Sequence, residues 1–204
     1  TDEIAQISER TSIEDVFQLI GLQMSCLNKP SPWSQFRARF PWLVWNILGG
    51  LACAVLSAFY EHLLAEVIVL ALFIPVVLAL AESVGMQSMT LTLQRLHGAA
   101  VERGEIARAV GRELVVAVAL GAACGGTVGC VIYLWKGSAV VGLAVAASIS
   151  LAMVTSCLLA VLLPTTVHAL KIDPRIAAGP IVLASADVAT LLFYFNLSLA
   201  FVVP

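Results

Sequence analysis

Three acidic residues lie within or beside stretches that are otherwise apolar, and their side chains are the ones best suited to bind a cation. Asp187 is the only formally charged residue between positions 176 and 204, and Glu66 and Glu82 bracket a second apolar run with Pro75 in its middle. A carboxylate inside a membrane span is costly and persists where it faces a cavity, a partner or an ion. No Lys or Arg occurs within the apolar runs to neutralise Asp187. The pattern predicts that Asp187 binds a cation or a proton.

Composition places these residues in a membrane protein. Hydrophobic residues make up 60% of the 204-residue chain and charged residues 12%, with a mean hydropathy of +0.98. A soluble domain has about 45–50% apolar and about 25% charged residues, so the chain is predicted to be an integral membrane protein in contact with the lipid bilayer.

The apolar residues form runs that are long enough to cross a bilayer, which takes about 20 residues as a helix. These runs predict an all-α integral membrane protein with five transmembrane helices, at residues 42–60, 63–93, 114–135, 139–167 and 176–203. The second run would measure roughly 45 Å as one helix, against a hydrocarbon core of about 30 Å. It is therefore expected to tilt, to kink at Pro75 or to leave the membrane near Gly85.

The basic residues predict the orientation. Ten of the eleven Lys and Arg residues fall on one side of the predicted spans, and only Lys136 falls on the other. Basic residues are enriched in cytoplasmic loops, so the N-terminus is expected in the cytosol and the C-terminus outside, in the cell (inner) membrane. Topology thus accounts for the basic residues, and no nucleic-acid partner is predicted.

The residues ahead of the first span predict a short amphipathic cytosolic helix. Ser12 and Asp15 resemble a capping box, and apolar residues recur at helical spacing on one face. They are Ile13, Val16, Phe17, Ile20 and Met24. The predicted division is a connecting helix and linker at residues 1–40 and a transmembrane domain at residues 41–204. The absence of an initial Met suggests a fragment of a longer protein.

Small residues recur every four positions in the third and fourth spans. The third has Gly121, Gly125 and Gly129, a spacing that lets two helix backbones approach closely. The fourth has Ser148, Ala152, Ser156 and Ala160. Helix packing within one chain is the expected use, and a contact between two copies is the alternative.

With this topology the acids mark three levels across the membrane. Glu61, His62 and Glu66 lie at the external end, and Asp187 lies about 16 Å from the cytosolic end of its span. Glu82 lies roughly 28 Å from the external end of its span. Uncharged oxygens follow Glu82 at Gln87, Ser88, Thr90 and Thr92.

Each of these residues can also be explained without a role in ion binding. Glu61, His62 and Glu66 are also compatible with a solvated loop, which is the favoured interpretation for His62. Glu82 is also compatible with snorkelling to the membrane surface or with an ion pair with an arginine such as Arg95. Tyr194 and Asn196, polar residues beyond Asp187, are assigned no role.

The residues predict transport of a divalent cation rather than catalysis. Hard divalent cations prefer oxygen ligands, and Mg²⁺ keeps much of its water. One carboxylate per chain is too few to strip that water, but two copies would supply two carboxylates around one hydrated ion. Two alternatives remain: a proton-coupled or differently selective metal transporter, and a non-conducting metal-sensing membrane module. No Ser/His, HExxH or paired-Asp pattern occurs in the spans, so no enzyme activity is predicted.

The order of several short motifs resembles the transmembrane domain of MgtE-type magnesium transporters over nearly the whole chain. The motifs are Arg39-Phe40-Pro41-Trp42-Leu43, Tyr60-Glu61, Phe73-Ile74-Pro75, Gly85-Met86-Gln87-Ser88, Ile172-Asp173-Pro174, Gly179-Pro180 and Asp187-Val188. The predicted helix before the first span also resembles the family segment that follows its cytosolic CBS domains.

The resemblance implies a homodimer with a pore at its axis, lined by the second and fifth spans. It implies that Asp187 of both subunits holds hydrated Mg²⁺ as the transported ion, with a structural or regulatory Mg²⁺ as a further implication. Glu61 and Asp173 match acidic family positions on the outer and cytosolic sides. On the second span, Pro75, Glu82, Ser83, Gly85 and Gln87 fall in the matching pore segment. The resemblance also implies cytosolic regulatory domains missing from this chain and a pore-closing N-terminal helix.

The chain departs from the family pattern at three places. Ala81-Glu82-Ser83 replaces Gly-Gly-Asn, Ala189-Thr190 replaces the Thr-Gly that follows Asp-Val, and Arg175 replaces the Ala of Asp-Pro-Ala. Because Glu82 adds an acid where the family has no charge, these departures bear on ion selectivity, among Mg²⁺, Mn²⁺, Co²⁺ and Ca²⁺, and on proton dependence.

Overall fold

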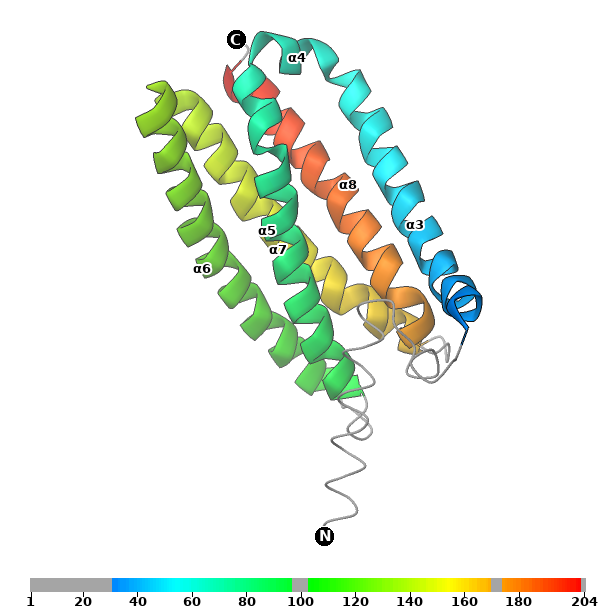
Figure 1. Cartoon of the computed structure of the whole chain (residues 1–204). Coiled ribbons are helices and arrows are strands. Elements are labelled where there is room, and N and C mark those ends of the chain that lie inside the picture. The colour runs from blue at the N-terminus through cyan, green and yellow to red at the C-terminus, as the bar shows by residue number, and fades with distance from the viewer. Residues whose placement is uncertain (1–30, 97–102, 170–173, 203–204) are drawn as a thin grey trace.

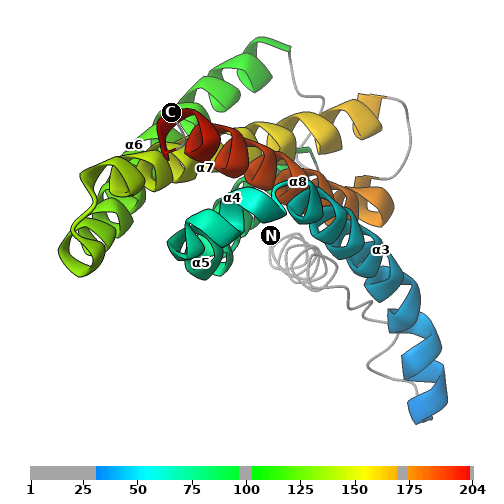
Figure 2. The same cartoon turned by 90° about the horizontal axis from the view of Figure 1, so that it is seen from above.

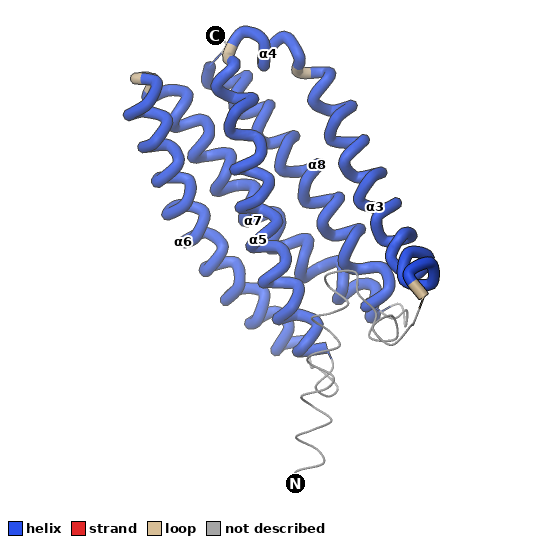
Figure 3. The backbone as a smooth tube through the Cα atoms, viewed as in Figure 1, coloured by secondary structure: helices blue, strands red, loops and turns tan. Residues whose placement is uncertain are grey.

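The computed structural model describes residues 31–96, 103–169 and 174–202, and this part of the chain is helical throughout apart from short connections. The helices are α3 (Pro32–Phe59), α4 (Glu61–Glu66), α5 (Ile68–Leu96), α6 (Arg103–Lys136), α7 (Ala139–Ala169) and α8 (Pro174–Val202). Long apolar sequences form helices in a membrane because a helix satisfies its own backbone hydrogen bonds where no water is present. Figure 3 shows this all-helical backbone.

Helix α7 lies at the centre of the bundle. It packs against α5, α6 and α8, and α3 packs on α8 at the edge (Figure 1). The view along the bundle in Figure 2 shows α3 extending away from the other helices. Helices α5 and α8 also touch, so these two helices and α3 surround the position of Asp187.

Four of the described helices are long and apolar enough to cross a membrane, and α3 makes a fifth if its two segments form one span. The segments Pro32–Pro41 and Leu43–Phe59 meet at an angle of 42°. The predicted all-helical membrane fold is confirmed. The predicted amphipathic helix around Ser12 lies outside the described residues, and α3 runs through the expected domain boundary at residues 40 and 41.

The long second run divides near its start, at Val67, and not at Gly85. Val67 separates the short helix α4 from α5, and α5 then continues through both Pro75 and Gly85. The expectation of a break near Gly85 is therefore wrong. The physical reason is a close approach: an added Cβ at Gly85 would lie 2.5 Å from the Ser156 Oγ of α7, so the glycine makes room for a helix crossing.

The glycine pattern of α6 is used for packing within the chain, as expected. Added Cβ atoms at Gly121, Gly125 and Gly129 would lie 2.9 Å or less from backbone atoms of α7. The Ser150 hydroxyl also donates a hydrogen bond to the Gly121 carbonyl oxygen at 2.9 Å. Such small residues at helix crossings let dispersion contacts and interhelical hydrogen bonds hold a membrane bundle together.

The two neighbouring glycines Gly125 and Gly126 provide a test of this packing. An added Cβ at Gly125 would lie 2.5 Å from the carbonyl oxygen of Ala146, whereas one at Gly126 would meet nothing within 4 Å. We expect Gly125→Ala to destabilise the protein by about 1–3 kcal/mol, since overpacking against a backbone forces helices apart. Gly126→Ala is the matched control and should leave the thermal unfolding midpoint unchanged or slightly raised, because Ala favours helix. Equal midpoints for the two variants would contradict the α6–α7 contact.

Candidate cation-binding site

Asp187 lies within α8, where three helices come together. Its side chain is half-buried, and its carboxylate interacts electrostatically with Glu82 of α5 and with the Cys53 thiol of α3. The flanking Ala186 and Thr190 are buried. The structure therefore turns Asp187 toward the side of α8 that meets α5 and α3.

Glu82 is part of an exposed polar surface on α5. Pro75, Glu82, Ser83 and Gln87 are all exposed, and their spacing places them on one side of the helix. Gln87 Nε2 donates a hydrogen bond to Ser83 Oγ at 3.4 Å. Glu82 does not pair with Arg95, because Arg95 Nη2 lies 3.3 Å from Glu113 Oε1 of α6. Within the described residues no ion pair involves Glu82 or Asp187.

Gly85 lies on the opposite side of α5, where it contacts α7. Beside it, the buried Ser156 hydroxyl donates a hydrogen bond to the Ala81 carbonyl oxygen at 2.7 Å. Ala81 immediately precedes Glu82, so this bond holds the backbone that carries the Glu82 side chain. Gly85 thus lies at the helix crossing, while Glu82 and the other three expected pore-lining residues share the exposed surface.

Tyr194 makes a second connection to α5. It is fully buried, and its hydroxyl donates a hydrogen bond to the Leu70 carbonyl oxygen at 2.8 Å. Because Tyr194 follows Asp187 by seven residues, or about two helical turns, both side chains lie on similar sides of α8. Sequence reasoning assigned Tyr194 no role, and this spacing from Asp187 was the available signal.

Asn196 and Tyr60 connect α8 to the end of α3 that leads into α4. Asn196 Nδ2 donates a hydrogen bond to Tyr60 Oη at 3.1 Å, and the Tyr60 ring stacks on Phe195 with a centroid distance of 4.8 Å. Glu61 follows directly as the first residue of α4 and is exposed. Asn196 lies nine residues beyond Asp187, about 14 Å along α8, so Glu61 and Asp187 are separate positions.

The remaining expected ligand, Asp173, lies outside the described residues. Across the described part of the chain, no three His, Cys, Asp or Glu side chains gather closely enough to hold a metal ion. Within a single copy, the carboxylates of Glu82 and Asp187 come from different helices and lie within electrostatic range of each other.

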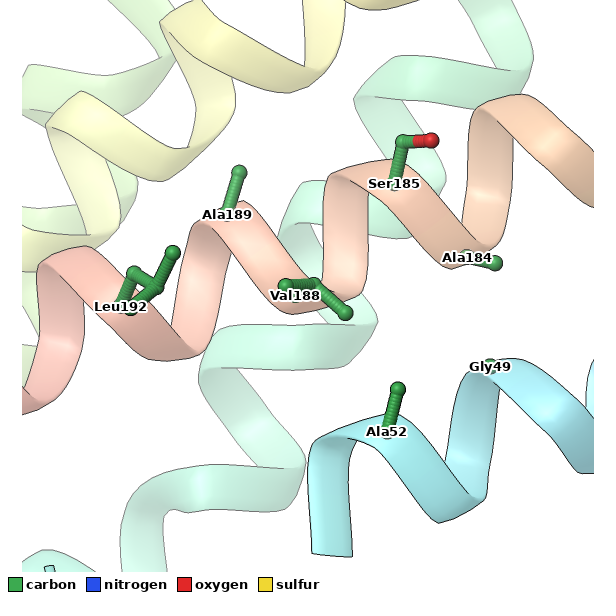
Figure 4. A pocket seen from close by; sticks show the side chains of 7 residues that line it. All are labelled: Gly49, Ala52, Ala184, Ser185, Val188, Ala189 and Leu192. Atoms are coloured by element: carbon green, nitrogen blue, oxygen red, sulfur yellow. The ribbon is translucent and has the colours of Figure 1, made fainter. Parts of the chain in front are cut away.

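A groove of about 430 Å³ separates parts of α3 and α8 beside this site. Gly49 and Ala52 line it from α3, and Ala184, Ser185, Val188, Ala189 and Leu192 line it from α8 (Figure 4). An added Cβ at Gly49 would lie 2.7 Å from Ala184 Cβ, so small residues set the distance between the two helices. Asp187 is not among the lining residues, and the groove is apolar apart from Ser185.

The fold is that of a helical membrane protein that carries two acidic side chains, Asp187 and Glu82, on neighbouring helices. The profile of the MgtE family, described as divalent cation transporter, matches residues 74–197. The chain belongs to this family.

Curated relatives agree with this assignment. A "Magnesium transporter MgtE" from Bacillus subtilis is 31% identical over 80% of this chain and 36% of its own length. Proteins of the same name from Enterococcus faecalis and Thermus thermophilus are 26% and 27% identical over 98% and 97% of this chain. Both matches cover 44% of the relative. The chain thus spans less than half the length of these relatives.

The contact between Gly85 and Ser156 predicts a compensating pair of substitutions. Gly85→Ala alone should destabilise the protein because its Cβ would lie 2.5 Å from Ser156 Oγ, whereas Ser156 Cβ is at 3.8 Å. Ser156→Ala alone removes a buried hydrogen bond, a loss of about 1 kcal/mol. In the double variant the atoms nearest the new methyl group are Cβ and the carbonyl oxygen of residue 156, at the ordinary contact distances of 3.8 and 3.9 Å, so the loss of stability should be smaller than the sum of the two single losses. Thermal unfolding of all four proteins measures this coupling, and strict additivity would contradict the contact.

Proposed function

We propose that the chain is the membrane domain of a magnesium transporter, in which two copies form a pore for hydrated Mg²⁺ with Asp187 as the main ion-binding residue. The observation that carries the proposal is the convergence of Asp187 and Glu82, from α8 and α5, with no cationic partner among the described residues. Two acids brought together inside a membrane repel one another unless a cation or a proton lies between them.

The exposed polar surface of α5 supports a pore formed by two copies. Glu82, Ser83 and Gln87 would face lipid in a single copy, which is unfavourable for a charged residue and two polar ones. Against the same surface of a second copy they would line a polar path. Such a path would have four carboxylates, from Asp187 and Glu82 of each copy. Mg²⁺ loses its water reluctantly, so carboxylates acting across a water shell suit it.

The other acids extend the proposed path. Glu61, exposed at the start of α4, would attract cations at the outer end, and Asp173 would act at the cytosolic end. We further propose cytosolic regulatory domains joined through a pore-closing helix within residues 1–40, with residues 41–204 conducting. In this scheme the N-terminus is cytosolic, the C-terminus lies outside, and the protein resides in the cell membrane. Mg²⁺ bound by the regulatory domains would control opening.

Replacing Asp187 with Asn tests the ion site. We expect Asp187→Asn to reduce Mg²⁺ uptake into proteoliposomes by at least about tenfold, the equivalent of about 1.4 kcal/mol, because an amide lacks the charge that attracts the cation. A Mg²⁺-sensitive dye inside the liposomes gives the rate.

Ser185→Ala is the matched control for Asp187→Asn. Ser185 is two residues away on the same helix but lines the groove toward α3, so uptake should stay at the wild-type rate. Wild-type uptake by Asp187→Asn at unchanged protein content would refute the assigned site. Equal losses in both variants would show a general disturbance of α8.

Crosslinking tests the two-copy pore. In a cysteine-free background, Ser83→Cys on the exposed surface of α5 should give a covalent dimer with a short thiol crosslinker in membranes, because the two α5 surfaces face each other. Thr127→Cys is the control, since Thr127 is exposed on α6, which the proposal places away from the axis. A dimer from Thr127→Cys and none from Ser83→Cys would contradict the proposed arrangement.

A further inference from the structure

The first ten residues of α3 form a segment with a direction of its own. Pro32–Pro41 makes an angle of 42° with Leu43–Phe59, and Pro41 inside the helix explains the bend, since proline removes a backbone hydrogen bond. The blue end of α3 in Figure 2 extends away from the bundle. We refer to Pro32–Pro41 as the bent segment.

One side of the bent segment is a ladder of stacked aromatic rings. The ring centroids of Trp33 and Phe36 are 5.3 Å apart, and those of Phe36 and Phe40 are 5.1 Å apart. The ladder is open to its surroundings, with exposed fractions of 67% for Trp33, 48% for Phe36 and 44% for Phe40. Three large rings left uncovered in this way mark a surface that meets an apolar phase or a partner.

Charged residues flank the ladder. At about 100° per residue, Arg37 lies on one side of the aromatic ladder and Arg39 on the other, and both side chains are exposed. No Asp or Glu occurs from Ser31 to Tyr60, so this surface carries positive charge only. Aromatic residues on one side of a helix with arginines at its flanks are typical of helices that lie in the membrane interface.

The ladder continues into the surface of the membrane span. Leu43, Ile47 and Leu51 follow Phe40 at intervals of three or four residues, and all three are exposed. The same side of α3 therefore passes without interruption from the span to the bent segment. A bilayer that covers Leu43 and Ile47 ends at the level of the aromatic ladder, where Trp rings and Arg side chains are favoured.

We propose that the bent segment lies in the headgroup region of the bilayer, with Trp33, Phe36 and Phe40 inserted at the acyl boundary and with Arg37 and Arg39 bound to the phosphates of anionic phospholipids. The ligand class is a phospholipid phosphate within a membrane surface. Arginines near an anionic membrane surface are attracted to it by the charge of the lipid headgroups. The segment would fix the height and direction of α3 at the membrane, independently of whether the protein conducts Mg²⁺.

Depth-dependent quenching of Trp33 fluorescence tests this placement. The whole chain is reconstituted in vesicles of phosphatidylcholine and phosphatidylglycerol, with bromine near the carbonyl end or near the methyl end of the acyl chains. The difference between wild type and Trp33→Phe isolates the Trp33 signal. We expect stronger quenching by bromine near the carbonyl end, because an interfacial helix lies about 5–10 Å deep at the acyl boundary.

Charge variants test the phosphate contact in the same assay. Omitting phosphatidylglycerol, or combining Arg37→Gln with Arg39→Gln, should reduce the quenching of Trp33. The matched control combines Arg108→Gln with Arg112→Gln on α6, which removes the same charge at two other exposed arginines. This control should leave the quenching of Trp33 unchanged.

Three outcomes would overturn the proposal. Water-like emission that bromine does not quench would place Trp33 in solvent. Blue-shifted emission without quenching would place it against protein. Quenching that stays the same without phosphatidylglycerol and in the arginine variants would rule out the contact with phosphates.

Discussion

The crossing of α5 over α7 at Gly85 and Ser156 sets the orientation of the α5 surface that carries Glu82. A Cβ at Gly85 would lie 2.5 Å from Ser156 Oγ, so a larger residue fits there only if that hydroxyl moves or is removed. The same serine binds the Ala81 carbonyl oxygen at 2.7 Å, and Glu82 is the next residue. In lipid, close packing and hydrogen bonds hold helices together because the hydrophobic effect between them is absent. This crossing therefore orients the polar surface of α5.

Helix α8 is held to the same scaffold, so the two acids form one site. Tyr194 binds the Leu70 carbonyl oxygen of α5 at 2.8 Å, and α8 packs along α7. Asp187 and Glu82 then interact electrostatically across the α5–α8 contact. Central helix α7 carries no formal charge and serves as the support against which the acid-bearing helices are positioned.

The sequence predicted the helices well, because apolar runs are a one-dimensional pattern. The lone charge in the last run singled out Asp187 as a candidate ion-binding residue, and that role stays a prediction. The role of Gly85 could not be obtained in the same way. A glycine within an apolar run is compatible both with a break and with a close helix contact, and only the partner Ser156, 71 positions later, distinguishes them. The spacing of Tyr194 from Asp187 places the two side chains on similar sides of α8, but the acceptor of the Tyr194 hydroxyl is a backbone carbonyl group, which no side-chain pattern reveals.

The most direct test of the account is the position of the ion in the membrane-embedded assembly. Crystals of the protein in lipid, grown with Mn²⁺ in place of Mg²⁺, would show the metal by its anomalous scattering. The account predicts a peak between the Asp187 carboxylates of two copies, about 4 Å from their oxygens, since a water molecule lies between ion and carboxylate. A peak remote from Asp187, or two copies whose Glu82 surfaces both face lipid, would contradict it.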